Sequence, residues 1–170
     1  MITRQTIHLL AASILAASFC TLTSCQKHKV YHAYAHTQQT EWSKEDSVHF
    51  MVPAVKESGC YQLETDLRIT RRYPFTSLTL IINRTIISPA AQSLLCKRML
   101  HADTIQCQLN DSSGRSLGKG VSYLQYEYPV SKFNLNEGDS MVISVRHHMK
   151  QETLPGISDI GVSLKVASGK

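Results

Sequence analysis

Four residues near the N-terminus, Leu22-Thr23-Ser24-Cys25, have the types and order that direct cleavage before a cysteine and attachment of lipid to that cysteine. The preceding chain fits an export signal, with one basic residue, Arg4, followed by the apolar run Ile7–Phe19. That run is too short to cross a bilayer, which takes roughly 20 apolar residues. We therefore predict that residues 1–24 are a cleaved signal peptide and that Cys25 is the lipidation site. The alternative is an ordinary signal peptide with a cysteine nearby by chance.

Cleavage there would leave a mature chain of 146 residues, which fits a single domain with its own core. Residues 25–30 would form a lipidated tether and residues 31–170 the domain. Two or more acyl chains give stable anchoring, whereas one gives only marginal binding. The mature chain has 17 basic and 13 acidic residues, spread along its length. We interpret this charge as a solvated surface and predict no nucleic-acid partner.

A second stretch, Gly114-Arg115-Ser116-Leu117-Gly118, matches the G-x-S-x-G pattern of hydrolases, in which the serine is a nucleophile on a strained strand-to-helix turn. Asp139 and His147 follow in the chain order of a catalytic triad. The context argues against this chemistry, because the segment opens with the flexible turn 110–113 and no helical pattern follows. We interpret the stretch as a glycine-rich hairpin turn and predict no catalytic residue, cofactor site or enzymatic activity.

Histidines form a third pattern: His28, His32 and His36 recur every four residues, and His147-His148 is a second cluster. Histidine is the commonest metal ligand, and this spacing brings the first three to one side of a strand or a helix. No carboxylate or cysteine lies at a complementary short spacing. We therefore predict structural or surface roles for these histidines and no metal site.

Three cysteines, Cys60, Cys96 and Cys107, remain after the signal and Cys25 are set aside. Within a monomer they allow at most one disulfide. A hairpin around His101-Ala102 would place Cys96 opposite Cys107, since two-residue loops are common hairpin connections. His-Ala is poor turn chemistry, and cross-strand geometry is often unsuitable for a bridge. The disulfide is therefore one hypothesis, and the three free thiols are the other.

Aromatic residues offer a last candidate surface. Tyr123, Tyr126 and Tyr128, together with the single tryptophan Trp42, have the types that line a glycan or partner groove. The other interpretation is that these rings seal the ends of a β-sandwich. We favour the second, because strands are rich in aromatic residues in any case.

Short alternating segments must position these side chains. The clearest is residues 60–70, where Tyr61, Leu63, Thr65, Leu67 and Ile69 face one way and Gln62, Glu64, Asp66 and Arg68 face a solvated side. The Leu- and Ile-rich segment 77–87 predicts a strand buried on both faces, and residues 90–95 fit either a short helix or a loop. Further strands are predicted over 30–36, 47–52, 104–109, 121–128, 141–146 and 160–166, separated by turn signals. The pattern predicts an all-β fold, an antiparallel β-sandwich of jelly-roll-like type.

Several of these segments also form a pattern that spans nearly all of the mature chain. It comprises Trp42 with Phe50; Tyr61 to Arg68; Tyr73-Pro74-Phe75 with Leu78; Asp103 to Leu109; Asp111, Gly114, Leu117-Gly118 and Gly120; Phe133 and Gly138; and a closing block from Met149-Lys150 through Leu154-Pro155-Gly156-Ile157-Ser158-Asp159-Ile160-Gly161-Val162. In these residues the chain resembles the GldH-type gliding-motility lipoproteins of Bacteroidota. The closing block is the most specific part. Lys150, in place of arginine, and Ser77, in place of asparagine, are the two departures, and neither touches known chemistry.

The resemblance implies a lipid-anchored, non-enzymatic component associated with gliding motility and type IX protein secretion. It carries no catalytic residue over to this chain. The implied partners are the membrane, through the lipid on Cys25, and other envelope proteins of the gliding or secretion machinery. Two alternatives come from the residues themselves: a carbohydrate-binding module on a lipid anchor, and a small hydrolase that uses Ser116.

The tether bears on the orientation of the domain. Residues Gln26-Lys27-His28-Lys29 include two lysines and no acid. Surface-exposed lipoproteins of this phylum typically have an acidic cluster directly after the lipidated cysteine. We therefore expect a periplasm-facing domain on the outer membrane, with each tether lysine contributing on the order of 1 kcal/mol at an anionic lipid surface.

Overall fold

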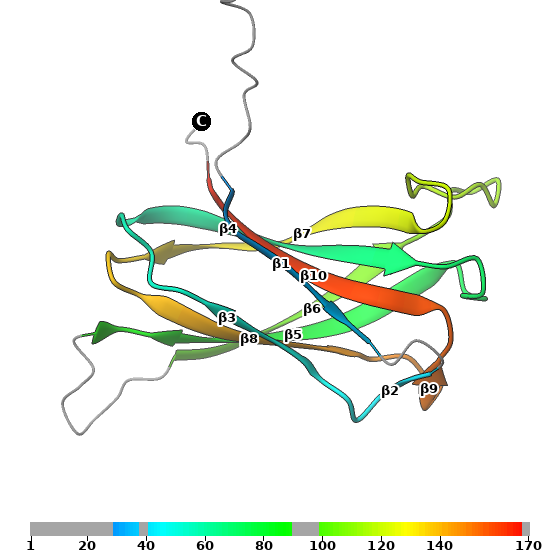
Figure 1. Cartoon of the computed structure of the whole chain (residues 1–170), viewed down its shortest axis with the longest axis horizontal. Coiled ribbons are helices and arrows are strands. Elements are labelled where there is room, and N and C mark those ends of the chain that lie inside the picture. The colour runs from blue at the N-terminus through cyan, green and yellow to red at the C-terminus, as the bar shows by residue number, and fades with distance from the viewer. Residues whose placement is uncertain (1–28, 38–40, 90–98, 168–170) are drawn as a thin grey trace, which may run out of the picture.

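The computed structural model describes residues 29–37, 41–89 and 99–167, and these residues fold into two antiparallel sheets packed face to face (Figure 1). Sheet 1 has the strand order β1 (Lys29–His36), β10 (Ile157–Val166), β4 (Gly59–Ile69) and β7 (Leu124–Leu135). Sheet 2 has the order β3 (Val48–Val52), β8 (Ser140–His147), β5 (Ser77–Ile87) and β6 (Met99–Gln108). The short strands β2 (Trp42–Ser43) and β9 (Thr153–Leu154) pair separately. The predicted antiparallel β-sandwich of jelly-roll-like type is confirmed.

The core lies between the sheets and is built from alternate residues of each strand. In β4, Tyr61, Leu63 and Leu67 are at most 2% exposed, as the period of two predicts. Their partners across the sandwich include Leu78, Leu80 and Ile82 of β5 and Ile143 and Val145 of β8, all at most 1% exposed. Burial of a large aliphatic side chain contributes about 1.5–3 kcal/mol, so this layer is the main source of stability.

Strand β5 differs from the prediction that it is buried on both faces. Residues Leu78, Leu80 and Ile82 point into the core, whereas the residues between them, such as Thr79 and Ile81, are only partly buried. The two leucines and four isoleucines of this segment suggested a central strand of a covered sheet. The outer face of sheet 2 has no further strand layer over it among the described residues, so the buried-strand prediction is wrong for that face.

Strand β6 overturns the hairpin predicted around His101-Ala102. It runs unbroken from Met99 to Gln108, and His101 pairs with Arg84 of β5. His-Ala supplies none of the positive-φ residues that a tight hairpin needs, so the chain continues straight. Cys107 is a free, fully buried thiol that faces the core. Cys96 lies outside the described residues, as does the undecided segment 90–95, of which all six residues fall in the gap before β6.

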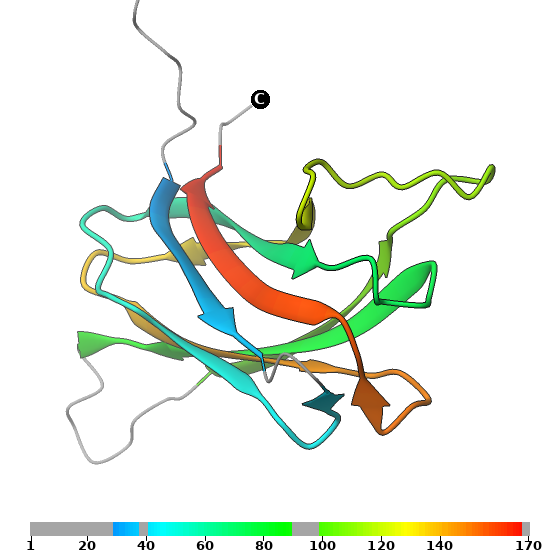
Figure 2. The ribbon, with the colours of Figure 1, turned by 45° about the vertical axis from the view of Figure 1, so that its right-hand side comes forward.

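Strand β1 forms one edge of sheet 1 and pairs along its length with β10 (Figure 2). It begins at Lys29, immediately after the predicted tether, and its start lies beside the end of β10. Only small or partly buried residues of β1 face the core, among them Ala33 and Ala35. The attachment of this strand therefore depends on its backbone ladder and on its outward-facing side chains.

Candidate functional site

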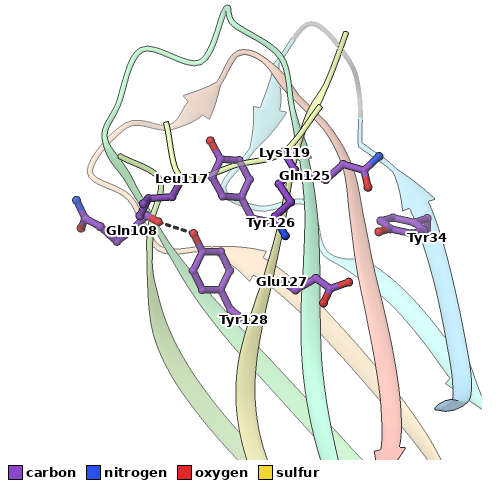
Figure 3. Close-up of a pocket in the computed structure, with 8 residues that line it drawn as sticks. All are labelled: Tyr34, Gln108, Leu117, Lys119, Gln125, Tyr126, Glu127 and Tyr128. Atoms are coloured by element: carbon purple, nitrogen blue, oxygen red, sulfur yellow. Dashed lines mark hydrogen bonds between the residues drawn. The ribbon is translucent and has the colours of Figure 1, made fainter. Parts of the chain in front are cut away.

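A pocket of about 400 Å³ straddles β7 at the open edge of the sandwich, where sheet 1 and sheet 2 are bridged by the connection between β6 and β7 (Figure 3). It is lined by Tyr34 of β1, Gln108 of β6, Leu117 and Lys119 of the connection, and Gln125, Tyr126, Glu127 and Tyr128 of β7. The lining thus joins Tyr34, near the start of the domain, to residues 108–128 from a much later part of the sequence. We treat this pocket as the candidate functional site.

The connection between β6 and β7 holds its shape through its own polar residues. The Asp111 carboxylate accepts hydrogen bonds from the amides of Ser113 and Arg115, each at 2.9 Å. Gly114 has a φ of 81°, which a residue with a Cβ rarely adopts. The Ser113 hydroxyl and the Arg115 amide lower the pKa of Asp111, which stays ionised and keeps accepting these bonds. The turn predicted over residues 110–113 is confirmed, and the antiparallel bridge from Asn110 to Ser116 closes it as a hairpin.

The G-x-S-x-G stretch has a structural role in this connection. Ser116 Oγ lies 2.9 Å from the Tyr126 hydroxyl and accepts a hydrogen bond from the amide of Gly118. Gly118 lies directly against the Tyr126 ring, because a Cβ at that position would approach Tyr126 Cζ to 2.5 Å. The motif therefore holds Tyr126 in place, and its second glycine, Gly118, makes room for the ring.

The two other residues of the hydrolase pattern lie elsewhere. Asp139 accepts a hydrogen bond from the Asn136 amide in the turn before β8. His147 ends β8, is fully buried, and has Nε2 3.2 Å from the carbonyl oxygen of Trp42. Eight residues of extended strand separate Asp139 from His147, which corresponds to roughly 26 Å. Ser116, Asp139 and His147 therefore form no triad.

The four aromatic residues singled out in the sequence separate into different environments. Tyr126 and Tyr128 line the pocket as a stacked pair, with centroids 6.3 Å apart and planes 11° from parallel. Trp42 is 1% exposed and packs edge-on against His147, the last residue of β8, which fits the sealing interpretation. Tyr123 is 43% exposed and lies outside the pocket lining.

Tyr128 joins the two sheets at this edge. Its hydroxyl donates to the carbonyl oxygen of Gln108, the last residue of β6 (Figure 3). Burial is the main cause of a raised pKa for this phenol, so the hydroxyl remains protonated and a donor at neutral pH. A second junction lies further along the same edge, where Arg84 of β5 pairs with Asp103 of β6 and donates to Ser131 Oγ of β7 at 2.6 Å.

The outer face of sheet 1 carries basic–acidic pairs between strands, and three of them start from β1. Lys29 lies 3.8 Å from Glu127 of β7, His32 lies 3.2 Å from Asp66 of β4, and His36 lies 2.5 Å from Asp159 of β10. The sequence has no carboxylate at a short complementary spacing from these histidines, because their partners are on other strands. His28 lies outside the described residues. Among the residues that the structure describes, no three His, Cys, Asp or Glu side chains gather around a metal position.

Asp66 corrects the prediction that this face of β4 is solvated. Its residue is 0% exposed, and neither carboxylate oxygen accepts a well-aligned hydrogen bond from the described part of the chain. Burial raises the pKa of Asp66, whereas His32 and Lys29 favour the charged form and lower it. The carboxylate is covered because the side chains of His32 and Tyr34 reach over it from β1, a burial that the alternation of β4 alone does not reveal.

Tyr34 completes this cover. Its ring lies over Gly161 of β10, where an added Cβ would be 2.7 Å from Tyr34 Cε1 and 2.9 Å from the Cβ of Asp66. The guanidinium carbon of Arg68 is 3.9 Å from the centre of the same ring. Such a cation–π contact contributes about 0.5–2 kcal/mol, depending on solvent exposure. Tyr34 thus connects the polar face of sheet 1 to the pocket that it lines.

Comparison with protein families gives a match to the GldH lipoprotein family over residues 29–164, nearly the whole described domain. The chain belongs to the GldH lipoprotein family. The resemblance drawn from the sequence is thereby confirmed, and with it the association of this lipoprotein with gliding motility and type IX secretion. The GldH family is not known as a family of enzymes.

Comparison with curated proteins gives no match. Solved structures that are similar include a selenomethionine-labelled α-amino acid ester hydrolase (9% identity, 72% of this chain, 24% of that chain, TM-score 0.39). An aminopeptidase from a Thaumarchaeota archaeon is 12% identical, with 71% of this chain and 23% of that chain covered and a TM-score of 0.39. Eiger TNF from S. frugiperda is 11% identical, with 82% and 94% covered and a TM-score of 0.31. The chain spans about a quarter of the length of the first two.

The described residues contain no helix that is both long and apolar enough to cross a membrane. Family membership makes the protein a lipoprotein, attached to a membrane through lipid. Cys25, the predicted lipidation site, and the rest of the signal and tether through His28 lie outside the described residues.

Proposed function

We propose that this GldH-family lipoprotein is a non-enzymatic docking component, anchored by lipid on Cys25 to the outer membrane and facing the periplasm. The observation that carries the proposal is the position of the family match, which begins at Lys29, four residues after the lipobox cysteine. The proposed segments are a signal peptide over 1–24, a tether over 25–30 and one domain over 31–170.

The short tether would keep the domain at the membrane. Four residues span at most about 14 Å when fully extended. The edge strand β1, which follows the tether, would therefore start close to the lipid headgroups. Lys27 and Lys29 would favour an anionic leaflet surface. This arrangement leaves the far edge and the loops of the sandwich available to envelope proteins.

The connection between β6 and β7 is the best candidate for the docking surface. It exposes three large apolar side chains: Leu117 at 54%, Val121 at 87% and Tyr123 at 43%. Apolar side chains gathered on one exposed loop are typical of protein-interaction surfaces. The same loop borders the pocket, since Leu117 and Lys119 line it.

The geometry gives less support to a carbohydrate-binding module. Stacking of a sugar needs an open aromatic face, but Trp42 is buried, Tyr126 lies on Gly118 and against Tyr128, and the Tyr34 ring lies on Gly161 with Arg68 over it. The hydrolase alternative lacks its triad. A docking role best explains why this member of a lipoprotein family exposes apolar side chains on the connection between β6 and β7.

Metabolic labelling with an alkyne fatty acid tests the anchor. We expect Cys25→Ala to abolish labelling and to leave an uncleaved or soluble protein, because the acyl chains supply the anchoring energy. Undiminished label in the variant would overturn Cys25 as the lipidation site. Protease shaving of intact cells tests the orientation: the domain should survive until the outer membrane is opened, and its loss from intact cells would contradict the periplasmic assignment.

A further inference from the structure

We propose that the outer edge of β7 at Glu127 is a docking site for an extended segment of a partner polypeptide, which adds to sheet 1 as a further strand beside the pocket. The proposal deepens the docking role and rests on it only for the origin of the partner in the envelope. The site itself consists of backbone and side-chain groups of the described residues on and beside β7.

The backbone of β7 already pairs with one added residue on the side away from β4. β7 is the outermost strand of sheet 1, and β4 is its only strand neighbour in the described part of the chain. On the other side Lys119 makes a single antiparallel bridge to Gln125, with N–H···O distances of 3.0 and 2.8 Å. The protein therefore already uses this edge as a template for one residue of added strand.

The next position on the edge is unpaired. Residues two apart on a strand direct their N–H and C=O groups to the same side, so Glu127 directs its groups outward as Gln125 does. No described residue outside the sheet makes a backbone hydrogen bond to Glu127. Glu127 also lines the pocket, so a segment that continued the bridge of Lys119 would lie there.

Pro129 limits the site. It lacks an N–H and follows Glu127 by two residues on the same edge, so it ends the available ladder. Proteins blunt exposed edges with proline because a long unpaired edge invites aggregation. The remaining template is short, which suits a single partner segment and disfavours open-ended pairing between copies.

The side chains of the pocket fit a polypeptide. Gln108 and Gln125 supply amides that donate and accept hydrogen bonds, and Lys119 supplies one ammonium group. The Glu127 carboxylate lies 3.8 Å from Lys29, so only the backbone of Glu127 is assigned to the partner. Amides with a single cation complement a peptide with polar side chains, whereas a polyanion would need an excess of basic groups. In strand addition, main-chain hydrogen bonds give affinity and pockets for alternate side chains give specificity. Leu117 and Tyr128 offer one such apolar contact.

A pair of variants at one position tests the backbone role. Glu127→Pro removes the outward N–H without breaking a bond to β4, and Glu127→Gln removes the same charge but keeps the N–H. The probe is a random linear dodecapeptide library displayed on phage, selected on the full mature chain purified in detergent. We expect enriched peptides to bind the wild type and Glu127→Gln within about threefold, and Glu127→Pro at least about fivefold more weakly, since one or two hydrogen bonds are lost.

Amide exchange gives a second readout that does not depend on the variants. A bound peptide should slow exchange of the Glu127 amide in the wild type at least about tenfold, because that amide becomes hydrogen-bonded. Equal binding to both variants, no peptide enrichment, or an unchanged Glu127 amide would overturn the proposal. Enrichment of a glycan on an array, lost on Leu117→Ala, would instead assign the pocket to carbohydrate. None of these results depends on the lipid anchor or the orientation, so failure here is distinguishable from failure of the proposed function.

Discussion

The imidazole of His32 lies 3.2 Å from the buried carboxylate of Asp66, and it reaches that carboxylate across the intervening strand β10. His32 is on the edge strand that follows the tether, and Asp66 is on the second strand inward. The contact therefore fastens the edge strand β1 to the interior of sheet 1. The pairs Lys29–Glu127 and His36–Asp159 extend this fastening along β1.

Asp66 should make stability depend on pH. Burial raises the pKa of this carboxyl above its ordinary value of 3.8, despite the opposing effect of His32. A carboxyl with a raised folded-state pKa contributes stability that is present below the unfolded-state pKa and is lost as pH rises through the folded value. Relative to the wild type, Asp66→Asn should therefore gain free energy of unfolding between about pH 3.5 and about pH 7. Urea denaturation at both pH values measures this, and Glu45→Gln, an exposed change, is the control.

Gly161 should be the least replaceable glycine of sheet 1. In Gly161→Ala the new Cβ would meet both the Tyr34 ring and the Cβ of Asp66 at less than 3 Å, so the ring must move off the sheet. Overpacking of this kind costs about 1–3 kcal/mol. The matched control is Gly59→Ala, where the nearest atom is 4.0 Å away. Equal denaturant midpoints for the two variants would contradict the close packing of Tyr34 on Gly161.

Ser116 and Tyr126 should act as a coupled pair in folding. Removal of their shared hydrogen bond by Ser116→Ala or Tyr126→Phe should each cost about 0.5–1.5 kcal/mol. The double variant should cost less than the sum of the two by about 0.5–1 kcal/mol, because the same bond is lost in each. Equilibrium unfolding of the four proteins completes the cycle. Strict additivity would show that the hydroxyls do not interact.

The cysteines should differ sharply in reactivity. Burial raises the pKa of the Cys107 thiol to about 12, and the side chain is fully buried. Cys60 is exposed at the start of β4. Iodoacetamide applied to the native protein should modify Cys60 and leave Cys107 unmodified until the domain unfolds, because the thiolate is the reactive species. Peptide mass mapping locates the label, and rapid labelling of Cys107 in the native state would contradict its position in the core.

Local patterns in the sequence were sufficient for much of the fold. The strict alternation predicts a strand over residues 60–70, because successive side chains of a strand point to opposite faces. The observed strand β4 spans Gly59–Ile69, so each end is correct within one residue. The polar turn after Leu109 and the end of the strand before Pro53 follow from equally local chemistry. The prediction that β5 is buried on both faces was wrong because it rested on the content of Leu and Ile. The hairpin around His101-Ala102 was wrong because those two residues continue strand β6.

The sequence by itself determined the fold class, an antiparallel β-sandwich, which residues of β4 face the core, and the family to which the chain belongs. Only the tertiary structure decided what the polar residues do, because each acts through a partner on another strand: Asp66 under His32, Ser116 on Tyr126, and Arg84 on Asp103. Alternation with a period of two shows which residues of one strand share a face. Which strands lie next to each other depends on the packing of the whole sandwich. The pocket beside β7 exists for the same reason, since only the closed fold brings Tyr34 to residues 108–128.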